Sequence, residues 1–191
     1  MLTIVYDMDD VLNNLNDYVS SALEIPIQNF SIFNISKIDT LTENEKRRIL
    51  EMYSNPNTFK HLAFRDSAYR IFNAARTGKA NVFIHSNNFK QEIADVKTKR
   101  ILAEIPGAKI ENISMTVASA DGKRAFTGAD IIVEDGFENC LRYESKCMKI
   151  LIDKPWNQCK TYGYIKDPDD IIRVGSLREA VNIVDSIVRI I

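Results

Sequence analysis

The sequence predicts an α/β protein in which a parallel β-sheet is flanked by helices on both faces. Short apolar runs typical of buried strands alternate with segments of helical periodicity, and this alternation favours parallel sheets. Three of the apolar runs end directly in acidic residues, at Asp7, Glu134 and Asp153. In open α/β sheets, ligands bind outside the carboxyl ends of the strands. The fold and the place of its site are therefore predicted together.

The expected elements follow in a regular order. We expect strands at residues 4–6, 80–85, 129–133, 148–152 and 171–174, with a weaker strand within 110–117. We expect helices at residues 11–23, 42–53, 66–76, 88–104, 137–143 and 177–190. Thr42 and Glu45 form a capping-box pattern at the start of one helix, and the last helix carries an apolar stripe at helical spacing.

Residues 14–65 interrupt the strand–helix rhythm, because they show helical and irregular patterns but no convincing strand. We expect this stretch to be a small helical cap inserted after the first strand and folded over the ligand edge of the sheet. Residues 1–13 and 66–191 would then form the core domain. A chain of 191 residues fits one domain with such an insertion.

Composition excludes several classes of partner. The chain carries 25 basic and 26 acidic residues, which gives no reason to expect a nucleic acid polymer or a membrane. No apolar stretch is long enough to cross a bilayer, and the first residues lack the basic start of a signal peptide. The three cysteines lack metal-type spacing, which fits a reducing compartment. We therefore expect a cytoplasmic protein; no pattern sets its oligomeric state.

The carboxylates after the first strand are the most informative feature of the chain. Asp7 and Asp9 lie two residues apart, so extended backbone would turn both toward one site. Carboxylates held so close repel each other unless a cation lies between them, and hard oxygen ligands suit Mg²⁺. The alternative is that an acid caps the following helix, which best explains Asp10. One helix start needs only one cap, so we expect Asp7 and Asp9 to be functional.

Later segments bring further groups toward the same edge. Ser86 and Asn87 follow the second strand, Glu134 and Asp135 follow a later one, and an intervening loop contains Lys123. Such groups at one sheet edge are what phosphoryl transfer requires. One carboxylate attacks phosphorus, Mg²⁺ and a lysine neutralise the phosphate oxygens, and a second carboxylate moves the proton.

Each of these residues also has a simpler explanation. Ser86 would cap the next helix, Glu134 or Asp135 would cap the helix after the later strand, and Lys123 would be a solvated loop residue. Their order along the chain and their shared position at strand ends favour function instead. His85 precedes Ser86, and we expect this histidine to be packed rather than catalytic.

Four segments in this order resemble the motifs of the haloacid dehalogenase superfamily of phosphohydrolases. They are Asp-Met-Asp-Asp-Val at 7–11, Phe-Ile-His-Ser-Asn at 83–87, Lys123, and Ile-Ile-Val-Glu-Asp at 131–135. Within the superfamily the chain is most similar to the 5'(3')-deoxyribonucleotidases. That likeness lies in the helical insertion after the first motif and in the tail Ile-Leu-Ile-Asp-Lys-Pro-Trp-Asn at 150–157. The resemblance spans essentially the whole chain.

The resemblance implies a Mg²⁺-dependent phosphomonoesterase that works through an aspartyl-phosphate, with deoxyribonucleoside monophosphates as its small-molecule substrates. Asp7 would be the nucleophile, and Asp9 would be the general acid and then the general base. Ser86 would hydrogen-bond the transferring phosphoryl group with Asn87 beside it. Lys123 would hold the phosphate and the nucleophile in place.

The implied metal site consists of Asp7, the backbone carbonyl of Asp9, Glu134 and Asp135. The nucleotidases usually show two aspartates in the last motif, so Glu134 is a departure from their pattern. Its longer side chain leaves open which of the two adjacent acids touches the metal directly and which acts through water.

Two further assignments remain open at this point. Lys123 and Arg124 are adjacent, and we prefer Lys123 because a compact ammonium suits contact with both phosphate and nucleophile. Phe30 and Phe33 in the insertion are candidates to stack on a base or a sugar. Aromatic residues in a small insertion also form its own core.

Other functions fit parts of the same pattern. A phosphatase or phosphomutase of the same superfamily, acting on another small phosphorylated metabolite, would share the motifs. A receiver-like signalling domain also combines acids, a hydroxyl and a lysine around Mg²⁺, but it is much shorter and its acceptor aspartate follows a later strand. The chain contains neither a dinucleotide-binding nor a P-loop glycine motif.

Overall fold

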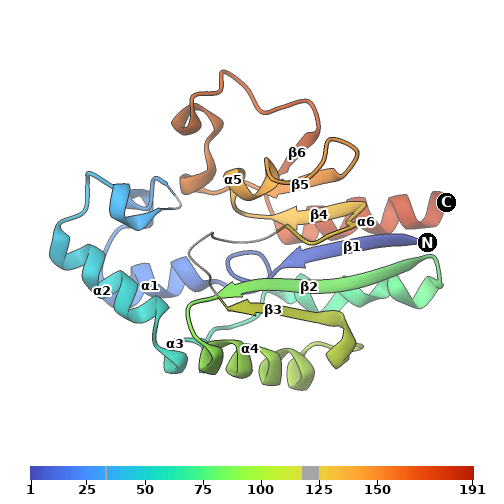
Figure 1. Ribbon diagram of the computed structural model, residues 1–191, viewed down its shortest axis with the longest axis horizontal. Helices are drawn as coiled ribbons and strands as arrows, with labels where there is room; N and C mark the ends of the chain where they lie inside the picture. Colours follow the sequence, from blue (N-terminus) through green and yellow to red (C-terminus); the bar gives the residue numbers. More distant parts are fainter. Residues whose placement is uncertain (33, 118–124) are drawn as a thin grey trace.

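A computed structural model describes residues 1–32, 34–117 and 125–191 of the chain. Its centre is a six-stranded sheet, in the order β3-β2-β1-β4-β5-β6, in which every neighbouring pair runs parallel (Figure 1). Helices flank this sheet, so the predicted α/β, Rossmann-like fold class is confirmed. The first strand lies in the middle, and this brings the acids of its carboxyl end to the centre of the sheet edge.

The strands agree closely with the expected ones. They are β1 (Leu2–Asp7), β2 (Ala80–Asn88), β3 (Ile113–Val117), β4 (Ile131–Glu134), β5 (Met148–Ile152) and β6 (Ile171–Val174). The main difference is β2, which continues through Ser86 and Asn87 instead of ending before them. These residues stay in the strand because β2 keeps pairing with β3 as far as Asn88 and Val117.

The helices differ more from expectation at their starts. They are α1 (Leu15–Leu23), α2 (Glu43–Tyr53), α3 (Pro56–Lys60), α4 (Gln91–Glu104), α5 (Phe137–Cys140) and α6 (Leu177–Ile190). The capping box of Thr42 and Glu45 is present at α2. Helix α1 begins four residues later than expected, because Asn13 forms a β-bridge with Phe64 and Asn14, the N-cap, has non-helical backbone angles (φ −124°, ψ 48°).

Short 3₁₀ helices make up much of the remaining structure. They are η1 (Ile27–Asn29), η2 (Ile35–Lys37), η3 (Asp66–Asn73), η4 (Ala75–Thr77), η5 (Ile110–Asn112), η6 (Pro155–Asn157) and η7 (Cys159–Tyr162). The α-helix expected at 66–76 is therefore wrong, since η3 and η4 occupy this stretch. Asp66 does not cap it, and η3 buries Ser67, Ala68, Ile71 and Phe72, so packing rather than helix propensity holds the segment.

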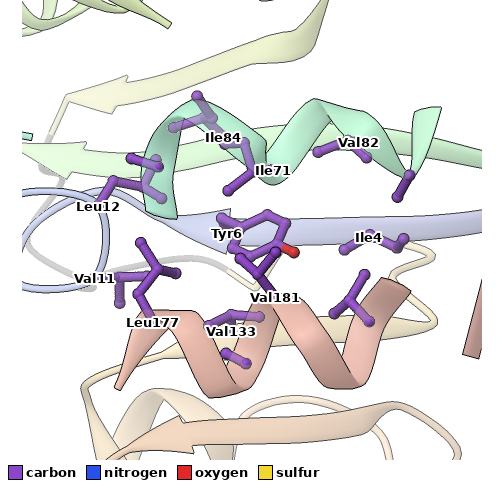
Figure 2. Packing of buried hydrophobic residues seen from close by; sticks show 14 of the residues in the cluster. Ile4, Tyr6, Val11, Leu12, Ile71, Val82, Ile84, Val133, Leu177 and Val181 are labelled. Atoms are coloured by element: carbon purple, nitrogen blue, oxygen red, sulfur yellow. The ribbon is translucent and has the colours of Figure 1, made fainter. Parts of the chain in front are cut away.

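Two hydrophobic clusters cover the two faces of the sheet. Alternate residues of a strand point to opposite faces, so Ile4 and Tyr6 belong to one cluster and Val5 to the other. The first cluster joins the sheet to η3, α4 and α6, and Figure 2 shows the Tyr6 ring between Ile71 and Val181. The second cluster joins it to α5. Both faces are thus buried, as a parallel sheet requires.

The segment 14–65 packs around a third hydrophobic cluster, to which α1, α2, α3 and the early 3₁₀ helices contribute. This segment lies beside the carboxyl ends of the strands, at the opposite side of the molecule from the two chain termini (Figure 1). Its ends meet where Asn13 and Phe64 form an antiparallel bridge, and the backbone N–H of Arg65 donates to the carbonyl of Leu12 at 2.8 Å. We propose that the boundary between the core and a cap runs through this crossing.

The structure also bears on compartment and membrane. None of the helices in the described parts of the chain is long and apolar enough to cross a membrane. Cys140, Cys147 and Cys159 are free thiols, and the first two are buried.

The burial of the Tyr6 hydroxyl can be tested by its effect on stability. Tyr6 is fully buried, and no atom of the described residues forms a hydrogen bond with its hydroxyl. Leaving a buried polar group without a partner costs about 1–3 kcal/mol. We therefore expect Tyr6→Phe to raise the free energy of unfolding by about 1 kcal/mol, measured by urea denaturation.

Tyr143→Phe is the matched control. The Tyr143 hydroxyl accepts a hydrogen bond from the backbone N–H of Phe126 at 3.2 Å. Its removal leaves that N–H without this partner, so the same measurement should show a loss of stability. A loss of stability in Tyr6→Phe would contradict the packing described above.

Candidate active site

The loop after β1 is fixed by its own side chains. The Asn13 Oδ1 atom accepts hydrogen bonds from the backbone N–H groups of Asp10 and Leu15, both at 3.1 Å, while Asn13 Nδ2 donates to Asp9 Oδ1 at 3.0 Å. Asp10 Oδ1 accepts from the backbone N–H of Asn16 at 2.8 Å. Asn14, not Asp10, is the N-cap of α1, but Asp10 still satisfies an N–H of the first turn. The loop therefore holds Asp9 in place beside the strand end.

Three of the predicted acids form a compact cluster. Asp7 lies at the end of β1, and Glu134 and Asp135 lie at the end of the adjacent β4. One carboxylate oxygen from each lies within 4.8 Å of those of the other two, and all three side chains are buried. The carboxylate of Asp9 is not in this cluster. Neither Glu134 nor Asp135 is the N-cap of α5, which is Gly136, so the simpler explanation of these acids is not supported.

The electrostatics of the cluster favour a bound cation. Burial, followed by the negative charges of Asp10, Asp7 and Glu134, raises the pKa of Asp135 well above its usual range. Burial is also the main cause that raises the pKa of Asp10 to about 7. A divalent cation among these carboxylates would remove the repulsion, and an all-oxygen donor set suits Mg²⁺ or Ca²⁺. The residues present therefore fit a hard metal ion.

Lys97 is the functional candidate that sequence reasoning missed. It lies on α4, and its side chain is only 1% exposed. Its ammonium group forms an ion pair with Asp9 Oδ2 and donates a hydrogen bond to Ser86 Oγ at 3.1 Å. The signal for it was present in the sequence, because Ile93, Lys97 and Ile101 share one helical stripe and all three are buried. A lysine in such a stripe requires an acidic partner.

The residues of the second motif have different partners, and it is Ser86 that contacts Lys97. Ser86 does not cap α4, whose N-cap is Lys90. The Asn87 Oδ1 atom accepts a hydrogen bond from Thr116 Oγ1 at 3.0 Å. His85 is buried, and its Nδ1 atom lies 3.1 Å from Ser114 Oγ. Its ring packs edge-on against the ring of Phe126. Ser86 and Asp9 thus both contact the ammonium group of Lys97.

A cavity of about 520 Å³ connects these groups. It reaches Asp7, Asp9, Ser86, Asn87 and Asp135, so acids and motif residues open into one space. The 14–65 segment lines it largely with apolar and aromatic side chains, which include Phe30, Ile32, Ile35, Leu50, Tyr53 and Phe59. The core adds Phe89, Ile93 and Trp156. Phe33, Lys123 and Arg124 lie outside the described residues.

The raised pKa of Asp10 predicts how the metal-free protein responds to pH. The folded-state pKa is about 7 and the ordinary value is 3.8, so the folded state binds a proton that the unfolded state releases in between. This contribution to stability is present at low pH and is lost as the pH rises through about 7. Asp10→Asn keeps an oxygen for the Asn16 N–H and removes the charge. In EDTA, we expect it to weaken the decline in unfolding free energy between about pH 4 and about pH 8.

Urea denaturation at a series of pH values checks this expectation. Asp169→Asn is the control, because Asp169 lies on the surface and its hydrogen bond and ion pair with Lys166 lower its pKa instead of raising it. An unchanged pH dependence in Asp10→Asn would show that this carboxyl ionises normally in the folded protein.

No protein-family model and no curated protein matches the chain. Solved structures match it over nearly its whole length. A haloacid dehalogenase-like family hydrolase from Streptococcus pneumoniae is 16% identical with a TM-score of 0.57, over 96% of this chain and 98% of that one. A D,D-heptose 1,7-bisphosphate phosphatase from B. bronchiseptica, complexed with magnesium and phosphate, is 13% identical with a TM-score of 0.56, over 100% of both chains.

A third structure gives the same result. A haloacid dehalogenase-like family hydrolase from Xanthomonas campestris is 14% identical with a TM-score of 0.55, over 99% of this chain and 98% of that one. At these identities the likeness establishes the fold and not the activity. The chain has the fold of the haloacid dehalogenase-like hydrolases.

Proposed function

We propose that this protein is a Mg²⁺-dependent phosphomonoesterase of the haloacid dehalogenase superfamily that acts in the cytosol. The observation that carries the proposal is one arrangement at the sheet edge. The acidic cluster of Asp7, Glu134 and Asp135 reaches, through Asp7 and Asp135, the same cavity that Asp9 and Ser86 line. Asp9 and Ser86 both contact the ammonium group of Lys97. A nucleophile, an acid–base group, a hydroxyl and a cation are thus within reach of one phosphoryl group.

The first chemical step uses the two acids of the first motif. A carboxylate oxygen of Asp7 attacks phosphorus, the bond from phosphorus to the ester oxygen breaks, and an aspartyl-phosphate forms. Asp9, once it has left Lys97 and taken up a proton from solvent, gives that proton to the departing ester oxygen. In the second step Asp9 takes a proton from water, the water oxygen attacks phosphorus, and inorganic phosphate leaves as the Asp7 carboxylate is restored.

Asp7, Glu134 and Asp135 would hold the metal ion. Bound there, Mg²⁺ would supply positive charge to the phosphate oxygens and to the crowded carboxylates. The phosphatase from B. bronchiseptica that shares this fold is complexed with magnesium and phosphate, which supports the choice of ion. Glu134 and Asp135 are both buried. In this proposal one of them touches the ion directly and the other acts through water.

The ion pair of Lys97 and Asp9 connects substrate binding to proton transfer. A phosphate that enters the cavity offers Lys97 new oxygen partners and competes with Asp9 for the ammonium group. Asp9 is then free to turn to the ester oxygen, while Lys97 and Ser86 bind the transferring group. Lys123, which the resemblance favours for the motif cation, lies in a part of the chain that the structure does not describe, so both lysines are candidates.

The lining of the cavity favours a nucleoside as the leaving group. The walls from the 14–65 segment are mostly apolar and aromatic, with Phe30 among them. A flat base buries apolar surface against such walls, whereas a sugar phosphate needs a hydrogen-bond partner for each hydroxyl. We therefore propose deoxyribonucleoside monophosphates as substrates and the 14–65 segment as the cap that binds their base.

Phosphate release tests the function. We expect release from deoxyribonucleoside monophosphates with Mg²⁺ and none with EDTA. Asp7→Asn should reduce it by about 10⁴-fold or more because the nucleophile is lost, while the circular dichroism spectrum stays that of the wild type. Activity retained in Asp7→Asn would exclude the covalent mechanism.

The substrate panel separates the alternatives. Ribonucleoside monophosphates and common sugar phosphates belong in the same assay. Release from sugar phosphates alone would keep the mechanism and exclude the nucleotidase. No release from any of them, but interconversion of a sugar phosphate when a bisphosphate is added, would indicate a phosphomutase.

Lys97→Gln tests which lysine serves the phosphate. Because Lys97 contacts both Asp9 and Ser86, we expect kcat to fall by about 10²–10³-fold, as for the loss of one stabilising donor. Lys99→Gln is the matched control, since Lys99 lies on the same helix and is exposed. Wild-type kcat in Lys97→Gln, with a large loss in Lys123→Gln, would assign the role to Lys123 instead.

A further inference from the structure

Trp156 and Asn157 lie outside the acidic cluster but both are bonded to it. They belong to η6, which follows β5 directly, and their exposed fractions are 1% and 0%. The Trp156 Nε1 atom donates to Asp135 Oδ2 at 2.7 Å, and Asn157 Nδ2 donates to the backbone carbonyl of Asp135 at 2.8 Å. Two consecutive residues thus hold the side chain and the main chain of one acid.

Asn157 is itself held from several sides. Its Nδ2 atom also donates to the carbonyl of Ile152 at 2.7 Å. Its Oδ1 atom accepts from the backbone N–H of Lys154 at 3.0 Å and from Arg173 Nη1 at 2.7 Å. Arg173 on β6 is in turn paired with Asp167 at 2.7 Å. The turn that carries Trp156 is therefore fixed to the last two strands of the sheet.

The indole ring is held separately from its N–H group. Trp156 belongs to the hydrophobic cluster of the 14–65 segment, where Phe30 and Val19 are also buried. The ring thus cannot rotate without disturbing that cluster, and its N–H points to Asp135. This donor engages one oxygen of Asp135, and the same carboxylate takes part in the acidic cluster with Asp7 and Glu134.

A neutral donor is suited to this position. Asp135 is buried among the carboxylates of Asp7, Asp10 and Glu134. Like charges so close repel each other, and the repulsion would rotate the Asp135 carboxylate away from its neighbours. A cationic partner would compete with a metal ion for the same oxygens. An indole N–H orients the carboxylate without neutralising it, and such partners of metal ligands set both ligand orientation and metal affinity.

We propose that Trp156 is a positioning residue for the metal site, which holds Asp135 in the orientation that binds the divalent cation. This proposal rests on the metal site proposed above. It goes further by assigning a role in cation affinity to a residue that contributes no ligand atom.

Calorimetric titration with Mg²⁺ tests the proposal on the full-length protein without substrate. Trp156→Phe keeps an aromatic ring in the hydrophobic cluster, removes the N–H donor and makes the side chain smaller. We expect it to raise the dissociation constant for Mg²⁺ by about 10–100-fold, the range found when partners of metal ligands are replaced. Val19→Ala is the control, because it trims the same cluster without contact to an acid and should lower stability but leave the Mg²⁺ dissociation constant unchanged.

A second measurement needs no variant. The chain has one tryptophan, so a ¹H–¹⁵N spectrum contains one indole N–H signal. We expect this signal to shift on addition of Mg²⁺ and to saturate with the calorimetric dissociation constant. An indole signal that stays still while Mg²⁺ binds would overturn the proposal, even if Trp156→Phe failed to fold.

The outcomes separate this inference from the proposed function. Equal Mg²⁺ affinity in wild type and Trp156→Phe would overturn the role of Trp156 and leave the metal site standing. An equal loss of affinity in Val19→Ala and Trp156→Phe would reduce Trp156 to a packing role and also overturn it. A wild-type protein that binds no Mg²⁺ would overturn both proposals.

Discussion

The crowding of buried carboxylates at the ends of β1 and β4 is the constraint on which the rest of the site depends. Asp7, Asp10, Glu134 and Asp135 are all buried there. An ion withdrawn from water costs several kcal/mol even after the surroundings relax, so a marginally stable protein must offset part of this cost locally. Neutral donors contribute to this offset: the N–H of Asn16 to Asp10, the amide of Asn139 to Glu134 and the indole of Trp156 to Asp135. These donors orient the acids and leave their negative charge available to a metal ion.

The site is therefore electrostatically asymmetric. On one side, neutral donors hold Glu134 and Asp135, and together with Asp7 these acids fit a cation from solution. On the other side, Asp9 already has a cationic partner within the chain, the buried Lys97. This difference between the two sides matches the proposed mechanism. The nucleophile, Asp7, benefits from a metal ion that also binds the phosphate. The acid–base group, Asp9, must exchange its partner during the catalytic cycle. Asp7 and Asp9, only two residues apart, have different neighbours, and the proposed mechanism gives them different roles.

The sequence was sufficient to predict the sheet and its acidic edge, because an apolar run followed by acids needs only local information. The 148–152 and 171–174 strands and the last helix match the structure residue for residue. Contacts made across elements could not be predicted in this way. That β1 lies next to β4 brings Asp7 to Glu134, and no local pattern states that adjacency. Ser86 stays in β2 only because β3 continues beside it, so the expectation that the strand ends before this residue was wrong.

Lys97 shows the same limit in reverse. A lysine on an apolar stripe is visible in the sequence, but its acidic partner lies 88 positions away and is identified only by the fold. Most lysines are exposed to solvent. From sequence alone, this general expectation outweighs the unusual position of Lys97 on an apolar stripe. The predicted cation, Lys123, was instead taken from the order of motifs, which carries no information on which cation lies beside Asp9.

The segment 14–65 and the core share the residues that close the site. The Lys97 ammonium group lies 4.5 Å from the centre of the Phe59 ring of α3, and Arg100 Nη1 donates to the Phe59 carbonyl at 2.9 Å. On the other side, the Trp156 ring packs in the cluster of the segment while its N–H holds Asp135. A change in the segment therefore reaches Asp9 through Lys97 and Asp135 through Trp156. In the proposed function the 14–65 segment also binds the leaving group, so substitutions there would alter the geometry of the acids and change specificity and rate together.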